Sequence, residues 1–219
     1  MQPKIYPVND RITLISLGGI DSNMYLVDHR LLIDTTTGLH KKALNIAFAN
    51  LDISKEDIQS VVLTHEHFDH IGGIGFFPEA NIIAHEKAAQ VIETGNDELS
   101  YAHYFNGHVA PRKVQVKLKD KDTIRIGDLK LEIIHTPGHT EGSICIYEPM
   151  NKILFSGDTV FKESTGRTDL ISGSEKELEA SLEKLEKFDI NIILPGHQGI
   201  VETEGNKHIK NILVNLRLL

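Results

Sequence analysis

A dense group of potential metal ligands follows a short apolar run in the first half of the chain. The sequence VVLTHEHFDHIGG occupies 61–73, and its β-branched residues predict a buried strand over 61–64. His65, His67, Asp69 and His70 then fall within six residues. Unpaired polar groups are costly at the end of a buried strand, so this spacing favours metal binding over four ordinary core or surface residues.

The alternation of side chains along an extended backbone predicts how this group divides. His65 and His67 would point the same way and bind one ion. Asp69 and His70 lie further along, where the chain is expected to enter a helix opened by Gly72–Gly73. They are therefore placed for a second ion, and the spacing indicates two metals rather than one.

Three later segments offer the remaining ligands. Each is a strand that ends in a turn, with a glycine beside the candidate ligand: HTPGHT, FSGDTV and LPGHQG. The candidates are His139, Asp158 and His197. Taken alone, each would as readily be an ordinary buried residue, but the first cluster favours the ligand role. Imidazole and carboxylate suit Zn²⁺ without a thiol, and the other histidines have no partner at ligand spacing.

The chain contains two halves with the same order of elements. LLIDTTTG, a helix and VVLTHEH in the first half resemble KILFSGDTV, a helix and NIILPGHQ in the second. Each half is strand–Asp–Thr, helix, strand–His, which predicts two βαβ-like units. Asp34 and Asp158 should therefore lie at related strand ends, and so should His65 and His197.

Local patterns predict the other elements. Helices are expected over 41–51 and 86–94, after a capping box at Ser174 and Glu177, and in the tail over 207–219. No linker rich in Pro, Gly or Ser interrupts the chain, so a single domain over 1–219 is predicted. Strands are expected over 12–18, 24–27, 31–34, 81–84, 143–147 and 152–157, in a hairpin over 123–134 with its turn at Gly127–Asp128, and from 191 to Pro195.

The composition excludes several classes of protein. A net charge of −8 argues against a general nucleic-acid or anionic-membrane binder. The single Cys145 excludes an internal disulfide, no apolar run approaches the roughly 18 residues of a membrane span, and the N-terminus lacks a signal-peptide pattern. A cytoplasmic protein acting on a small molecule is expected. The apolar stripe of the tail could be a homodimer face, although packing on its own domain is favoured.

The motifs THEHFDH, GHT, SGDT and PGH occur in this order and resemble the metallo-β-lactamase superfamily, with likeness from Asp34 to His197. The resemblance implies a fold of the α/β (α+β) class, an αββα sandwich of two mixed sheets packed face to face with helices outside. It implies that Asp34 stands behind the ligands and orients them. The implied ligands are His65, His67 and His139 for the first metal, Asp69, His70 and His197 for the second, and Asp158 as the bridge.

Within the superfamily, the likeness is greatest to glyoxalase II, a hydroxyacylglutathione hydrolase, on LFSGDTVF followed by TGR. It implies thioester hydrolysis by a metal-bound hydroxide, with Asp69 and Asp158 as catalytic residues. Two divalent ions are implied, with zinc favoured and iron or manganese as alternatives. The chain ends too soon after His197 for the helical domain with which glyoxalase II holds glutathione. Arg167 matches a basic position that contacts the thiol substrate, and a structural pair with Asp169 is the alternative.

Two other activities and one further segment complete the predictions. Two alternatives follow from the same resemblance. One is a lactonase or other ester hydrolase that uses the same metals. The other is a persulfide dioxygenase with a single iron bound by residues matching His65, His139 and Asp158. The aromatic segment 96–113 is longer than an ordinary connection. It predicts that Tyr101, Tyr104 or Phe105 lines the substrate cleft, with packing beneath the loop as an equal alternative.

Overall fold

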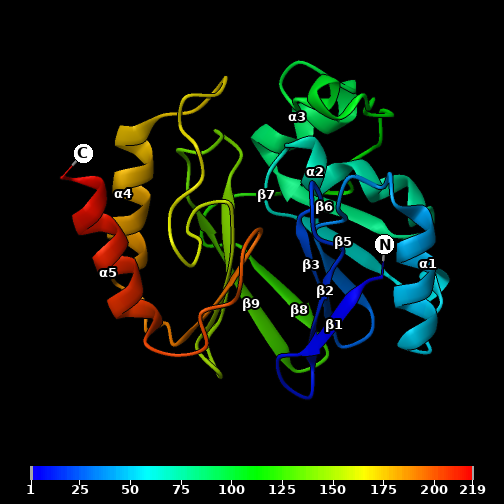
Figure 1. Ribbon diagram of the computed structural model, residues 1–219, viewed down its shortest axis with the longest axis horizontal. Coiled ribbons are helices and arrows are strands. Elements are labelled where there is room, and N and C mark those ends of the chain that lie inside the picture. Colours follow the sequence, from blue (N-terminus) through cyan, green and yellow to red (C-terminus); the bar gives the residue numbers. More distant parts are fainter. Residues whose placement is uncertain (1, 219) are drawn as a thin grey trace. The chain divides into compact units, whose positions relative to one another are not determined.

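The computed structural model describes residues 2–218, which form two compact units (Figure 1). The first unit contains the chain up to Ala84 together with Ala88–Lys117, and the second contains His85–Lys87 together with the chain from Leu118 onward. Each unit has one β-sheet with its own helices. The single domain expected from the sequence stays a prediction.

The first sheet has seven strands in the order β1-β2-β3-β4-β5-β6-β7. The strands β1 to β4 pair antiparallel, whereas β4, β5 and β6 are parallel neighbours. The strands are β1 (Lys4–Pro7), β2 (Ile12–Ser16), β3 (Asn23–Val27), β4 (Leu31–Ile33), β5 (Ser60–Leu63), β6 (Asn81–His85) and β7 (Val116–Leu118). The helices are α1 (Lys41–Asn50), α2 (Phe68–Ile71) and α3 (Glu86–Thr94), with 3₁₀ turns η1 (Lys55–Asp57), η2 (Gly72–Phe76) and η3 (Ala102–Phe105).

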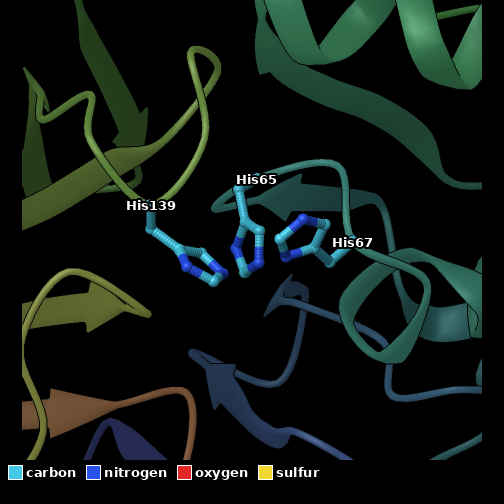
Figure 2. A group of neighbouring side chains, drawn as sticks. All are labelled: His65, His67 and His139. Atoms are coloured by element: carbon cyan, nitrogen blue, oxygen red, sulfur yellow. The ribbon is translucent and has the colours of Figure 1, made fainter. Parts of the chain in front are cut away.

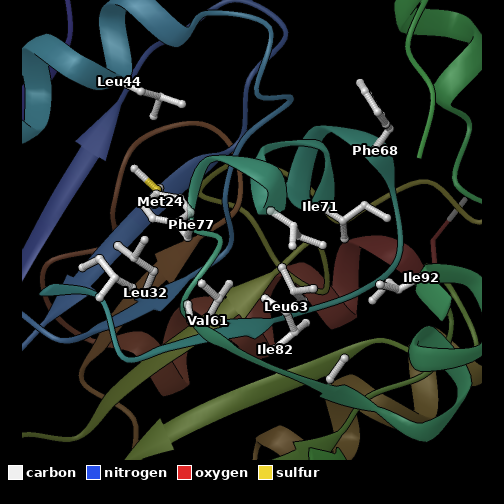
Figure 3. Close-up of a cluster of buried hydrophobic side chains, with 14 of the residues drawn as sticks. Met24, Leu32, Leu44, Val61, Leu63, Phe68, Ile71, Phe77, Ile82 and Ile92 are labelled. Atoms are coloured by element: carbon white, nitrogen blue, oxygen red, sulfur yellow. The ribbon is translucent and has the colours of Figure 1, made fainter. Parts of the chain in front are cut away.

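A single apolar cluster joins the helices of this unit to one face of the sheet (Figure 3). Helix α1 contributes Leu44 and Phe48 at helical spacing, and α3 contributes Ile92. They pack with the alternating strand residues Val61 and Leu63 of β5. Full burial of each such side chain stabilises the fold by about 1.5–3 kcal/mol, so this cluster fixes the strand ends that carry the first histidines.

The second sheet has five strands in the order β12-β11-β10-β9-β8. The predicted hairpin is present, because Ile126 pairs with Leu129 across Gly127, whose φ of 58° suits a tight turn. Strands β8 to β11 are antiparallel, and β11 is parallel to β12. The elements are β8 (Thr123–Ile126), β9 (Leu129–His135), β10 (Ile144–Glu148), β11 (Ile153–Gly157), β12 (Ile192–Pro195), α4 (Glu175–Leu185) and α5 (Gly205–Leu216).

Helices α4 and α5 cover their own sheet in the second unit. Leu182 and Leu185 of α4 share an apolar cluster with Ile209, Ile212 and Leu213 of α5 and with inward-facing strand residues. The tail therefore packs on its own unit, as the sequence favoured. Two mixed sheets with flanking helices confirm the predicted fold class. Within the described residues, none of the helices combines the length and the apolar character needed to cross a membrane.

The two units repeat one arrangement, as the sequence echo predicted. In the first, β4 leads through α1 to its parallel neighbour β5, and in the second, β11 leads through α4 to its parallel neighbour β12. The carboxyl ends of parallel neighbours meet at the same edge of a sheet. Asp34 and His65 therefore come to one edge of the first sheet, and Asp158 and His197 come to one edge of the second.

The structure differs from the predictions in three places. The edge strands β1 and β7 were not expected, and the segment 96–113 contains η3. Helix α2 begins at Phe68, before the glycines expected to open it. Gly72 and Gly73 instead allow close approach, since a Cβ on each would lie 2.3 Å from Thr37 O and 2.0 Å from Thr35 O.

A pair of stacked histidines in the second unit gives the fold a pH dependence. His85 and His135 lie with ring centroids 4.0 Å apart and planes 11° from parallel. Burial of His85, and next the nearby His135, lower the pKa of His85 from 6.5 to about 4. The nearby Glu86 and Asp120 act in the opposite direction, but more weakly.

We expect the free energy of unfolding of the metal-free protein to fall as the pH drops from about 6.5 towards 4. In this range His85 is protonated in the unfolded chain but neutral in the folded protein. The free energy of unfolding therefore changes by at most about 1.4 kcal/mol per pH unit. Urea unfolding in chelator at several pH values measures this slope. The His85→Phe variant should show a smaller slope than wild type. The control variant His29→Asn, at a surface position, should keep the wild-type slope. Equal slopes in wild type and His85→Phe would contradict the assignment of this pH dependence to His85.

Candidate metal centre

The seven predicted ligands divide between the two units. Figure 2 shows His65 and His67 on the segment that follows β5, and His139 on the loop after β9. All seven are side chains of a kind that can hold a metal ion. The first ligand set, in the first unit, is His65, His67, Asp69 and His70; the second ligand set, in the second unit, is His139, Asp158 and His197.

The first ligand set is tightly packed. The ring centroid of His65 lies 4.8 Å from that of His67 and 4.1 Å from that of His70. His70 Nε2 lies 3.8 Å from Asp69 Oδ2. All three imidazoles are buried, whereas Asp69 is partly exposed. Three buried imidazoles this close cannot all carry a proton charge, and neutral rings are the form that binds metal.

Asp34 determines which ring nitrogen of His70 carries the proton. Its carboxylate lies 2.8 Å from His70 Nδ1, and it accepts 2.8 Å hydrogen bonds from the backbone N–H and the hydroxyl of Thr64. Because a carboxylate accepts, Nδ1 of His70 carries the proton and Nε2 becomes the electron-pair donor. Metal-ligating histidines are held in this way. The contact is the one that the predicted orienting role of Asp34 requires.

Through Thr64, Asp34 also determines which ring nitrogen of His65 carries the proton. Its hydroxyl has one proton, which goes to Asp34, so the oxygen accepts from His65 Nδ1 at 3.2 Å. Nε2 of His65 is then also the electron-pair donor. One buried carboxylate therefore orients two predicted ligands.

The backbone of α2 is held by two neighbouring loops. Thr35 donates to His70 O from both its N–H and its hydroxyl, at 2.8 Å each, and Ser22 N donates to Asp69 O at 3.3 Å. These hydrogen bonds fix the carbonyls of the two ligands that α2 carries. The loops rather than the short helix itself set the position of Asp69 and His70.

Asp21 is a supporting residue that sequence reasoning missed. Its buried carboxylate accepts from Thr37 N at 2.9 Å and from Thr37 Oγ1 at 2.5 Å, and it lies 2.5 Å from His40 Nδ1. It thereby ties the loop after β2 to the loop after β4. No motif marked Asp21, and the only signal was an acidic residue between two strands.

The second ligand set converges on one oxygen atom. Asp158 Oδ2 lies 3.5 Å from His139 Nε2 and 3.6 Å from His197 Nε2. Both separations exceed the 2.7–3.2 Å of an ordinary hydrogen bond. The carboxylate oxygen thus stands between two imidazole nitrogens, an arrangement that suits a cation on each side.

A backbone carbonyl orients His139. Its Nδ1 donates to Arg167 O at 2.7 Å, which makes Nε2 the electron-pair donor. Gly166, just before, donates from its N–H to Asp158 O at 3.0 Å. A Cβ on Gly166 would lie 2.1 Å from that oxygen and 2.9 Å from His139 Nδ1. The glycine of TGR is therefore required by close packing, a reason that the sequence motif did not reveal.

The Arg167 side chain faces solvent. It forms a two-pronged pair with Asp169 at 2.9 and 2.8 Å, and both side chains are exposed. This is the structural alternative weighed from the sequence, and the pair lowers the pKa of Asp169. Contact of Arg167 with a substrate stays a prediction.

The three aromatic residues of the predicted substrate segment take different positions. Tyr101 meets the ring of His67 edge-on at 5.3 Å. Tyr104 is 72% exposed. Phe105 is partly buried against the apolar core, 5.7 Å from the ring of Phe68. Phe105 thus follows the packing alternative, while Tyr101 and Tyr104 keep the predicted cleft role open.

Gly166→Ala should lower the affinity for metal by about 10- to 100-fold, because its methyl group would displace both Asp158 O and the His139 ring. Competition with a chromophoric chelator measures this affinity, and thermal unfolding in chelator checks the fold. Gly75→Ala is the matched control, since a Cβ there meets no atom within 4 Å. Wild-type affinity in Gly166→Ala would refute the role given to this glycine.

Comparison with known proteins places this geometry in a family. The model of the metallo-beta-lactamase superfamily matches residues 17–197. Human acyl-coenzyme A thioesterase MBLAC2 is 30% identical over 211 residues, which cover 82% of this chain and 74% of the human protein. The probable hydroxyacylglutathione hydrolase glo2 of Schizosaccharomyces pombe is 29% identical over 150 residues, 65% of this chain. This alignment spans 49%, about half, of the yeast protein.

The fold comparison agrees with the sequence comparison. The crystal structure of the BLEG-1 B3 metallo-beta-lactamase superposes with a TM-score of 0.75 at 28% identity, and the match covers 90% of this chain and 95% of that one. The matched region spans strands β3 to β12 and all seven candidate ligands. The chain belongs to the metallo-β-lactamase superfamily.

Proposed function

We propose that this chain, a metallo-hydrolase of the metallo-β-lactamase superfamily, hydrolyses thioesters of small molecules. The observation that carries the proposal is the position of Asp158 Oδ2, within 3.6 Å of both His139 Nε2 and His197 Nε2. A carboxylate between two nitrogen donors suits a pair of cations better than one. Similarity to an acyl-coenzyme A thioesterase and to a probable hydroxyacylglutathione hydrolase supports the thioester.

The donor atoms fit two divalent ions. Imidazole and carboxylate ligands suit zinc, with iron and manganese as alternatives. A thiolate is not among them, because burial raises the pKa of Cys145 to about 11 and its side chain lies in the apolar cluster of the second unit. We propose His65, His67 and His139 for one ion, Asp69, His70 and His197 for the other, and Asp158 between them.

Divalent ions bound here would supply an activated water at neutral pH and polarise the substrate carbonyl. The protein residues prepare this chemistry beforehand. Asp34, Thr64 and the Arg167 carbonyl hold three imidazoles with Nε2 as the donor. With only two carboxylates in the ligand set, the loaded centre would keep a net positive charge, which stabilises an oxygen that becomes negative in acyl transfer.

Asp69 is the proposed proton carrier. It is partly exposed, unlike the histidines of its set, and its Oδ2 lies 3.8 Å from His70 Nε2. A carboxylate that reaches both the centre and the solvent side can move a proton to the departing thiolate. The helix position held by Ser22 and Thr35 fixes its distance from the reacting atoms.

A substrate panel tests the reaction class. Protein loaded in turn with zinc, iron and manganese would be assayed on a glutathione thioester, an acyl-coenzyme A, a lactone, a β-lactam and a persulfide. We expect kcat/KM to be at least about 10-fold higher for a thioester than for any other class. Oxygen-dependent turnover of the persulfide at one iron per chain would instead establish a dioxygenase, and a preference for the lactone would establish a lactonase.

Asp158→Asn should lower kcat on the best thioester by at least about 100-fold, because a neutral amide cannot balance two adjacent cations. Metal analysis should show less than two ions per chain in the variant. Asp189→Asn, an exposed aspartate of the same unit that pairs with Lys152, is the matched control. Turnover close to wild type with two ions retained would show that Asp158 is not the bridge.

A further inference from the structure

We propose that Tyr101, His103 and Tyr104 form an aromatic wall that selects thioesters with a planar, uncharged acyl group, such as an aryl-substituted acyl chain. The inference rests on the proposed function and specifies its substrate. It concerns the first unit alone, where the wall continues directly from a predicted metal ligand.

The three rings form one compact cluster in which each ring contacts the other two. Tyr101 and Tyr104 lie 5.5 Å apart with planes 25° from parallel. His103 lies 4.4 Å from Tyr104 and 5.9 Å from Tyr101. Tyr101 in turn meets His67 edge-on at 5.3 Å. These separations fall close to the range of favourable aromatic contacts, so the cluster joins the predicted ligand His67 to the exposed ring of Tyr104.

One side of η3 is packed on the core, and the other is exposed to solvent. Ala102 is fully buried and Phe105 packs on Phe68, which holds η3 to the core. His103 and Tyr104 point the other way and are exposed. Core packing therefore explains Phe105 but leaves the large exposed ring of Tyr104 without a structural role.

The backbone that carries the wall is anchored to the core on both sides of η3. Ser100 O accepts from Phe68 N at 2.8 Å, and Gly107 is packed so closely that a Cβ would lie 2.3 Å from the Phe68 ring. Tyr101 and Asn106, which bound η3, both have left-handed backbone, with φ of 58° and 49°. Such conformations cost about 1–3 kcal/mol each for a non-glycine residue and gather at functional sites. These contacts hold the backbone of the wall against Phe68.

The chemistry of the wall identifies the group it binds. The stacked phenol rings of Tyr101 and Tyr104 offer aromatic faces and hydroxyls, which suit an uncharged aromatic group better than a phosphate or a carboxylate. Coenzyme A and glutathione are both anionic thiols, so neither matches this surface. Its contact with His67 places the wall next to the reacting carbonyl. The acyl group attached to that carbonyl is therefore the part of the substrate that stacks here.

The test compares two thioesters of one uncharged thiol, phenylacetyl- and acetyl-N-acetylcysteamine. We expect metal-loaded wild type to prefer the phenylacetyl compound in kcat/KM. Tyr104→Leu should reduce this preference by about 2- to 12-fold through KM, since one stacking contact is lost. Tyr104→Phe should restore it. Tyr6→Leu, on the exposed strand β1, is the control and should keep the wild-type ratio.

A binding measurement separates the wall from the reaction. Calorimetric titration with phenylacetate and with acetate requires no turnover, and wild type should bind phenylacetate more tightly, with the difference reduced in Tyr104→Leu. If neither thioester is hydrolysed but this difference is present, the proposed function fails and the wall stands. If both thioesters are hydrolysed at a ratio that Tyr104→Leu does not change, the wall is refuted while the proposed function remains.

Discussion

The hydrogen bonds of the Asp34 carboxylate are the interaction on which the first half of the site depends. They join the end of β4 to Thr64 at the end of β5 and to His70 on α2. Asp34 has left-handed backbone, with a φ of 61°, and this turns its side chain back towards the next strand. Removing this buried acceptor would leave the Thr64 and His70 donors without their partner, at a cost of about 1–3 kcal/mol.

In the second unit, a different group orients the histidine ligand. There the Arg167 carbonyl, rather than a carboxylate, fixes the imidazole of His139, and Gly166 brings that carbonyl close enough. In both units most of the ligands follow parallel strands joined by one helix, so the repeated βαβ arrangement brings them to one edge of their sheet. His139 is the exception, because it follows the antiparallel strand β9. The repeated topology supplies position, and the local hydrogen bonds supply orientation.

The sequence predicted most of this because the signals were local. A β-branched run marked β5, a short apolar run marked β11, helical spacing marked α1 and α4, and the THEHFDH motif marked the first ligand set. What it missed depends on approach between distant segments: Gly166 and Gly73 are required by oxygens of other loops, and Asp21 by Thr37 and His40. Short edge strands such as β7 lack a periodic pattern long enough to detect.

We propose that Asp158 lies between two metal ions, because its Oδ2 stands close to the donor nitrogens of both His139 and His197 in its own unit. Anomalous diffraction from crystals of the zinc-loaded protein, recorded on both sides of the zinc absorption edge, tests it most directly. The account predicts two anomalous peaks about 3.5–4 Å apart, with an Asp158 oxygen bound to both. A single peak, or two peaks that share no oxygen of Asp158, would contradict it.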